Sequence, residues 1–207
     1  MVLNKYRSTA DPYLLPLAKR LRNVEPNTLT WLAFVFAVLA GIFFYLSEIW
    51  WWLLLAVLCL FLSALLDALD GKIAKITGKA SKRGDFLDHV LDRYADVFII
   101  GGIMLSVYCD WFIGILAMLG VLLASYMGTQ AQALGCGRDY GGILGRADRL
   151  VILIIVPLIQ LLVNKELDGR IWLFTPIEYA MIWFAIAGHI TAVQRGVRSW
   201  KKLGKRR

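Results

Sequence analysis

The residues of this sequence best suited to chemistry are aspartates, and six of its eleven aspartates fall within one short stretch. If the chain is helical there, Asp67 and Asp70 share one face of a first helix, and Asp88 and Asp92 share one face of the next. Carboxylates gathered this closely repel one another, so some must be protonated or a divalent cation must bind. Because the ligands are oxygens, the pattern predicts Mg²⁺ or Mn²⁺ rather than zinc.

Three nearby residues are predicted to lie outside this ligand set. Asp85 and Asp96 fall near the same stripe and are interpreted as salt-bridge partners or supports. His89 is turned about 100° from Asp88 on a helix of 3.6 residues per turn, so we expect it to pack or to meet lipid headgroups. The alternative is a solvated helix end whose acids pair with neighbouring lysines and arginines. The membrane setting described next argues against it, because each charge at depth costs roughly 2.5 to 3.5 kcal/mol.

The elements that carry these acids are predicted to be membrane helices. The chain has 207 residues, 59% of them hydrophobic, with eight tryptophans. A spanning helix needs about 20 apolar residues. The sequence therefore predicts an all-α integral membrane protein whose six spans cover roughly residues 28–48, 49–69, 90–109, 111–134, 149–164 and 173–193.

The distribution of basic residues predicts the orientation of these spans. Of the 23 lysines and arginines, 21 lie in the two termini and in the connections after the second and fourth spans. The positive-inside rule places these segments in the cytoplasm. We therefore expect a multi-pass protein of the cell membrane, with both termini and the acidic stretch on the cytoplasmic side.

The chain is expected to comprise one membrane domain with two flanking segments. Residues 1–26 mix apolar and basic side chains, as in an amphipathic helix lying in the interface. Residues 27–194 hold the spans, and residues 195–207 form a basic tail suited to anionic lipid headgroups. The net charge of +8 does not indicate nucleic acid, because the basic residues flank membrane spans instead of forming a separate soluble domain.

The acids and their neighbours also form a specific motif. It resembles the signature of the CDP-alcohol phosphatidyltransferase (CDP-alcohol phosphotransferase) family, DxxDGxxAR followed by GxxxDxxxD. The family's arginine is a lysine here, which keeps the charge but loses the bidentate fork. The resemblance extends to the PNxxT entry of the first span and to most of the chain. The matching positions are Asp67, Asp70, Gly71, Ala74, Lys75, Gly84, Asp88 and Asp92.

The resemblance implies an enzyme of phospholipid biosynthesis. Such an enzyme transfers a phosphatidyl or archaetidyl group from a CDP-linked lipid to the hydroxyl of a polar acceptor and releases CMP. It implies two Mg²⁺ or Mn²⁺ ions held by the four signature aspartates, with Asp92 also acting as general base. It further implies a homodimer. The residues expected near the CDP moiety are Asn27, Thr30, Gly71, Lys75, Ser81 and Gly84.

The acceptor region resembles that of the members using inositol phosphate, which include archaeal archaetidylinositol-phosphate synthases. "SYMGTQAQALG" and "GGILGRADRL" stand where that group reads SYxKARAExxG and GG…ERxER. Gly128 and Gln130 replace a lysine and an arginine of that pattern. Inositol phosphate is thus the predicted acceptor, and glycerol 3-phosphate, serine or another alcohol is the alternative. The candidate acceptor-binding residues are Arg83, Arg138, Arg146 and Arg149.

Two other classes of protein compete with the enzyme. A cation or proton-coupled transporter also places carboxylates within a membrane domain, but it typically places charges at mid-span in both halves. Here the acids gather at one membrane face. A non-catalytic scaffold would have no need of Asp92, so replacing that residue by asparagine distinguishes a scaffold from an enzyme.

Overall fold

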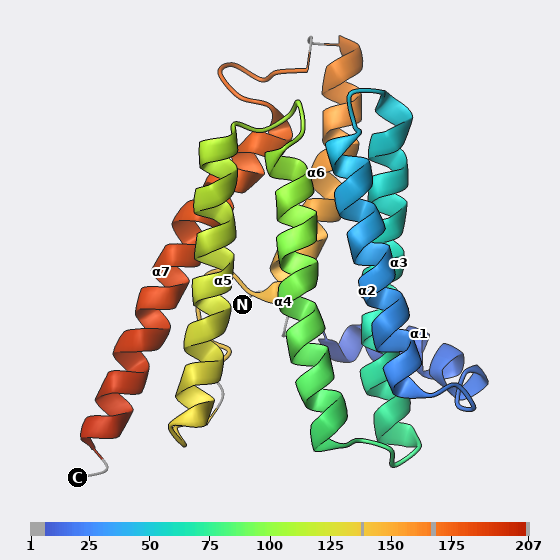
Figure 1. Ribbon diagram of the computed structural model, residues 1–207, viewed down its shortest axis with the longest axis vertical. Coiled ribbons are helices and arrows are strands. Elements are labelled where there is room, and N and C mark those ends of the chain that lie inside the picture. Colours follow the sequence, from blue (N-terminus) through green and yellow to red (C-terminus); the bar gives the residue numbers. More distant parts are fainter. Residues whose placement is uncertain (1–6, 138, 167–168, 206–207) are drawn as a thin grey trace. The chain divides into compact units, whose positions relative to one another are not determined.

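The computed structural model describes residues 7–137, 139–166 and 169–205. Every regular element in these ranges is an α-helix, as the sequence predicted (Figure 1). The seven described helices are α1 (Arg7–Arg20), α2 (Pro26–Tyr45), α3 (Trp50–Ile76), α4 (Lys82–Met104), α5 (Trp111–Ala133), α6 (Arg146–Glu166) and α7 (Pro176–Gly204).

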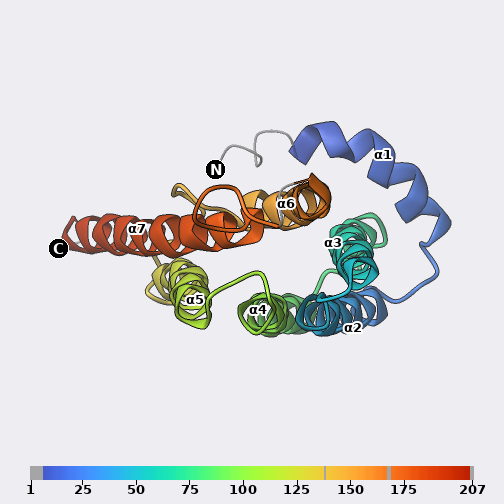
Figure 2. The ribbon, with the colours of Figure 1, turned by 90° about the horizontal axis from the view of Figure 1, so that it is seen from above.

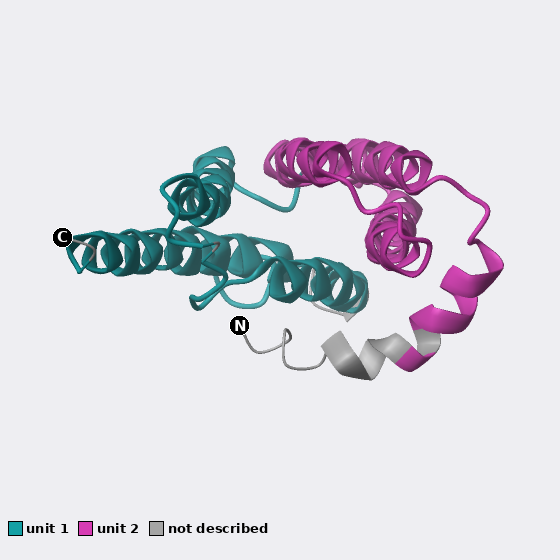
Figure 3. Ribbon diagram, turned by 90° about the horizontal axis from the view of Figure 1, so that it is seen from below, with its two compact units in different colours: residues 1–3, 107–207 teal, residues 4–106 magenta. Residues whose placement is uncertain are grey.

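The chain divides into two compact units (Figure 3). We call the one that contains α1 to α4 the N-terminal unit, and the one that contains α5 to α7 the C-terminal unit. Every acid of the predicted metal site lies in the N-terminal unit.

In the N-terminal unit, α2 packs against both α3 and α4 (Figure 2). Two glycines allow α2 and α4 to approach closely. A Cβ added to Gly102 would overlap the backbone of Gly41, and one added to Gly41 would overlap the carbonyl of Phe98. At the same time, α1 packs against α3 around a buried cluster that contains Ala18 and Ile73. The cluster around Ile73 lies at the end of α3 that carries Asp67 and Asp70, whereas the glycine contact lies toward the far end of α4.

The C-terminal unit also contains two helices that approach closely at a pair of glycines. Its α7 packs against α5 and α6. A Cβ added to Gly188 would lie 2.6 Å from the carbonyl carbon of Gly120, so α5 and α7 also cross at a pair of glycines. Any larger side chain at either crossing would push the two helices apart.

The turn between α3 and α4 folds one acidic pair back toward the other. After α3 ends at Ile76, Gly78 adopts a φ of 67°, in the left-handed region where glycine is preferred. Ser81 then caps α4, its hydroxyl accepting a hydrogen bond from the Gly84 N–H at 3.1 Å.

Five helices of the described chain are long and apolar enough to span a membrane, namely α2, α3, α5, α7 and the Arg146–Asn164 part of α6. The span predicted at residues 90–109 is not among them. It corresponds to α4, which is 23 residues long but carries several charged residues in its first four turns. Only the end of α4 is continuously apolar. Helix α7 also extends beyond the predicted span at 173–193, so much of the basic tail continues it.

Candidate metal centre

The last turns of α3 and the first turns of α4 bring the predicted acids together. Carboxylate oxygens of Asp67, Asp70 and Asp88 lie within 4.8 Å of one another. Asp70 is buried, with 6% of its surface exposed, and the other two are half-buried. A buried carboxylate beside two others requires compensation by a proton or a cation. The oxygen-only donor set therefore fits a hard divalent cation.

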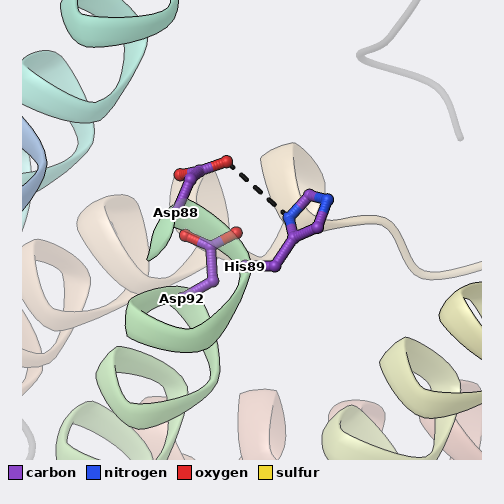
Figure 4. A group of neighbouring side chains, drawn as sticks. All are labelled: Asp88, His89 and Asp92. Atoms are coloured by element: carbon purple, nitrogen blue, oxygen red, sulfur yellow. Dashed lines mark ion pairs between the residues drawn. The ribbon is translucent and has the colours of Figure 1, made fainter. Parts of the chain in front are cut away.

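A second group shares one carboxylate with the first. Asp88, His89 and Asp92 each offer a ligand atom within 4.8 Å of the others (Figure 4). The imidazole Nδ1 of His89 lies 3.7 Å from Asp88 Oδ2, and its Nε2 lies 3.3 Å from Asp85 Oδ1. His89 therefore lies among the candidate ligands, although its helical spacing from Asp88 predicted that it would point away from them. Because Asp88 belongs to both groups, the arrangement can accommodate two neighbouring cations.

Helix α2 contributes a hydroxyl to this site. The side chain of Thr30 donates a 2.6 Å hydrogen bond to Asp70 Oδ2 and approaches the Pro26 carbonyl at 3.2 Å. Thr30 is itself buried, with 6% of its surface exposed, so this hydrogen bond to Asp70 is formed inside the protein. The sequence predicted Thr30 as a nucleotide contact; this link to an acid 40 residues away requires the packing of α2 on α3.

Arg93 lies against the other buried acid. Its Nη2 is 3.5 Å from Asp92 Oδ2 and 3.6 Å from Asp96 Oδ2, so one guanidinium is shared between two carboxylates. Asp92 is 6% exposed. The sequence interpreted Asp96 as a support, and this ion pair agrees with that interpretation.

Three of the residues predicted near the CDP moiety gather at the start of α4. A Cβ added to Gly84 would lie 3.3 Å from both Asn27 Oδ1 and Ser81 Oγ. Gly71 is different, because nothing lies within 4 Å of an added Cβ there. Open space beside Asp70 leaves room for a ligand. Lys75 is exposed one turn farther along α3.

The predicted acceptor-binding arginines do not lie in one unit. Arg83 is exposed in the N-terminal unit, whereas Arg146 is half-buried and Arg149 is buried in the C-terminal unit. Arg138 lies outside the described residues. Arg146 and Arg149 lie three residues apart at the start of α6 and therefore share one face of that helix.

A buried arginine that the sequence reasoning missed organises the connection between α5 and α6. Arg195, 7% exposed, donates from Nε to the Gly141 carbonyl at 2.8 Å and from Nη1 to the Ala124 carbonyl. On the same helix, Thr191 accepts hydrogen bonds from the N–H groups of Ile143 and Leu144. The sequence assigned Arg195 to the basic tail because it follows the last apolar run. No local pattern signals its burial.

An ion pair completes this network. Arg198 Nε donates to Asp139 Oδ2 at 2.7 Å, and the Gly141 N–H donates to Asp139 Oδ1 at 2.8 Å. Burial opposes ionisation of Asp139, but these hydrogen bonds and the charges of Arg198 and Arg195 outweigh it and lower the pKa of the carboxyl. A Cβ added to Gly128 would lie 3.2 Å from Arg195 Nη1. The guanidinium thus lies beside the position where the resemblance implied a lysine.

Comparisons with known proteins are consistent with this geometry. Residues 23–191 match the sequence profile of CDP-alcohol phosphatidyltransferases. The chain is 33% identical over 204 residues to an archaetidylinositol phosphate synthase of Pyrococcus horikoshii, covering 98% of each chain. It is 29% identical over 209 residues to a phosphatidylinositol phosphate synthase of Cutibacterium acnes, covering 95% of this chain and 96% of the other.

The fold also matches solved structures. The phosphatidylinositol phosphate synthase of Mycobacterium tuberculosis with CDP-DAG bound superposes with a TM-score of 0.72 at 24% identity, covering 90% of this chain and 93% of that one. The same protein in complex with manganese and citrate gives a TM-score of 0.73 at 23% identity, covering 90% and 88%. At this level of identity the likeness shows the fold.

Proposed function

The chain belongs to the CDP-alcohol phosphatidyltransferase family, and from that premise we propose that it transfers a phosphatidyl or archaetidyl group from a CDP-linked lipid to inositol phosphate, releasing CMP. The observation that carries the proposal is the pair of ligand groups joined at Asp88. Transfer between two phosphate-bearing substrates needs concentrated positive charge, and clustered carboxylates are a means of holding it.

Asp67, Asp70, Asp88 and Asp92 would hold two Mg²⁺ or Mn²⁺ ions, with His89 an additional candidate ligand. When bound, the ions supply the positive charge that stabilises the diphosphate and the leaving CMP. The chain's own residues do the remaining work. Thr30 holds Asp70 in place by its hydrogen bond, and Asp92 accepts the proton of the attacking hydroxyl.

The CDP moiety would lie along the surface that runs from Gly71 to the start of α4. Gly71 leaves space beside the acids, and Asn27, Ser81 and Gly84 line the far side of the turn. Lys75 provides a positive charge for phosphate. This grouping supports the assignment, because residues from α2, the turn and α4 converge where the family motif places the nucleotide.

The acceptor assignment rests on the relatives and on the basic residues of the chain. The two curated relatives compared above are named for inositol-phosphate lipids. Arg83, Arg138, Arg146 and Arg149 remain the proposed contacts for the acceptor's phosphate. If α4 also spans the membrane, in addition to the five helices named above, the chain has six spans. Six spans would place the acids and both termini on the cytoplasmic side. The enzyme would function as a homodimer.

The direct test is CMP release by the purified enzyme. CDP-archaeol and CDP-diacylglycerol should each be offered with inositol phosphate, glycerol 3-phosphate and serine, in the presence of Mg²⁺ or Mn²⁺. We expect release with inositol phosphate and none after chelation. Release with glycerol 3-phosphate or serine alone would overturn the acceptor assignment. Asp92→Asn should retain donor binding but release no CMP, whereas an active Asp92→Asn enzyme would contradict the role of Asp92.

A further inference from the structure

The connection between α6 and α7 contains a tight turn with an unusual residue at its tip. The N–H of Ile171 donates a 3.0 Å hydrogen bond to the Phe174 carbonyl, which closes the turn around Trp172 and Leu173. Trp172 has a φ of 60°, the left-handed value that glycine adopts easily. It is the one non-glycine residue in the described chain with a positive φ. For a bulky side chain this conformation costs about 1–2 kcal/mol.

Contacts from both flanking helices hold the turn in this shape. The Tyr179 hydroxyl donates to the Ile171 carbonyl at 3.1 Å, and the Tyr179 ring meets Phe174 edge-on at 5.4 Å. From α6, the side-chain amide of fully buried Gln160 donates to the Gly169 carbonyl at 2.8 Å. The backbone on each side of the tip is therefore fixed, and the strain at Trp172 is maintained by its surroundings.

This rigid turn holds two large apolar side chains away from the protein. Trp172 is 94% exposed and Leu173 is 75% exposed. In water this arrangement would be unfavourable twice over, since the turn is strained and its apolar tip is hydrated. A covering phase of low polarity would remove the second cost.

The position of the turn indicates that the lipid bilayer is this low-polarity surrounding. It connects α6 and α7, which are both long and apolar enough to span a membrane, and the connection between two such helices is expected at the surface of the bilayer. The N-terminus of α5 lies at the same end, because the Asp110 N–H donates to Glu178 Oε1 at 2.7 Å. Trp111, the first residue of α5, is 61% exposed there.

We propose that Trp172 and Leu173 form a membrane anchor, inserted at the boundary between lipid headgroups and acyl chains at this end of the C-terminal unit. Tryptophan favours this boundary because its ring is apolar and its indole N–H can remain hydrated. Arg170, two residues before the tip, is exposed, and in this arrangement its guanidinium would meet the lipid phosphates. A second protein is a poorer match, because two side chains are far fewer than the roughly 20–30 residues of a stable interface.

The test measures the depth of each tip residue in vesicles of phosphatidylcholine and phosphatidylglycerol. A single cysteine at 172 or 173 carries a nitroxide, after replacement of Cys59, Cys109 and Cys136. Collisions with oxygen and with a water-soluble nickel chelate are then compared. Position 79, in the exposed α3–α4 turn, is the aqueous control, and position 58, exposed near the midpoint of the span predicted at residues 49–69, is the hydrocarbon control.

We expect the oxygen-to-nickel ratio at 172 and 173 to fall between the two controls, at least about threefold above position 79. Adding Trp172→Ser to the 173-labelled protein should move that label toward the aqueous value. A ratio equal to that at position 79 would overturn the proposal, and so would low accessibility to both reagents, which would indicate a protein cover.

A second measurement needs no cysteine replacement. In the otherwise natural chain, Trp172→Ala should reduce the quenching of tryptophan fluorescence by lipids brominated near the headgroup, because one exposed tryptophan at that depth is lost. Unchanged quenching after Trp172→Ala would contradict the anchor.

Discussion

The two units of this protein treat buried charge in opposite ways. In the N-terminal unit, Asp70 and Asp92 are buried beside other carboxylates, so acidic groups predominate although Arg93 lies 3.5 Å from Asp92. In the C-terminal unit, buried Arg195 donates to two backbone carbonyls and Arg198 pairs with Asp139. The acidic arrangement is suited to binding cations, whereas the hydrogen bonds of the two arginines stabilise the fold without a ligand. Under the proposed function, the buried acids of the N-terminal unit would serve chemistry, whereas the hydrogen bonds of Arg195 and Arg198 serve structure.

The strongest prediction concerns Asp88, the acid common to both ligand groups. Asp88→Asn should lower the rate of CMP release by about 10²–10⁴-fold, because one carboxylate is lost from both groups. Without metal, the variant should unfold at the same or a higher temperature than the natural protein, since repulsion is relieved. Rates with Mn²⁺ and melting in chelator measure the two effects. A metal-free variant that is less stable than the natural protein would show that Asp88 stabilises the fold, and the contrast between the two units would not hold.

Arg195→Met should have the opposite effect on stability. The substitution leaves the carbonyls of Gly141 and Ala124 without this donor inside the protein, which should cost roughly 2–4 kcal/mol. Chemical unfolding in detergent measures this loss. Lys201→Met, at an exposed position on the same helix, is the matched control and should change the stability little. Equal stability of the two variants would remove Arg195 from its structural role.

The next prediction concerns the positively charged side chain of Arg93, which lies beside Asp92 and Asp96. Arg93→Ala should lower kcat about tenfold, equivalent to about 1.4 kcal/mol, with little change in KM for the CDP-lipid. The reason is that Asp92 loses the guanidinium shared with Asp96. Arg93→Lys should restore part of the rate, and Lys82→Ala on the same helix should leave it unchanged. A rise in KM alone would indicate a different role for Arg93.

The smallest effect is expected from the ion pair in the C-terminal unit. Asp139→Asn should cost about 1 kcal/mol of stability at pH 7, because the Arg198 partner is partly exposed. The pKa of Asp139 is lowered in the folded protein, so its contribution is complete above the ordinary pKa of an aspartate and is lost as the pH falls through the folded value. Unfolding followed from pH 7 into acid should show the two proteins converging, and a constant gap would exclude this origin.

Much of the fold and of the acidic site follows from local sequence. Apolar runs near 20 residues predicted the helices, and the glycines at 78 and 84 marked the turn that reverses the chain. The predicted number of spans is not confirmed at one helix, where apolar and charged residues compete. Helix α4 combines an apolar end with a charged beginning, so it was assigned as a span at 90–109, although it starts at Lys82 and carries the second acidic pair.

The sequence by itself determined the chemistry available, because the spacing of Asp67, Asp70, Asp88 and Asp92 is a property of helical periodicity and of the turn between two adjacent helices. Only the tertiary structure decided which groups assist them. The bond from Thr30 to Asp70 and the burial of Arg195 join residues 40 to 71 positions apart. Such contacts depend on how helices pack. For α5 and α7, which carry Ala124 and Arg195, the close approach occurs at Gly120 and Gly188, and this pairing cannot be read from local sequence.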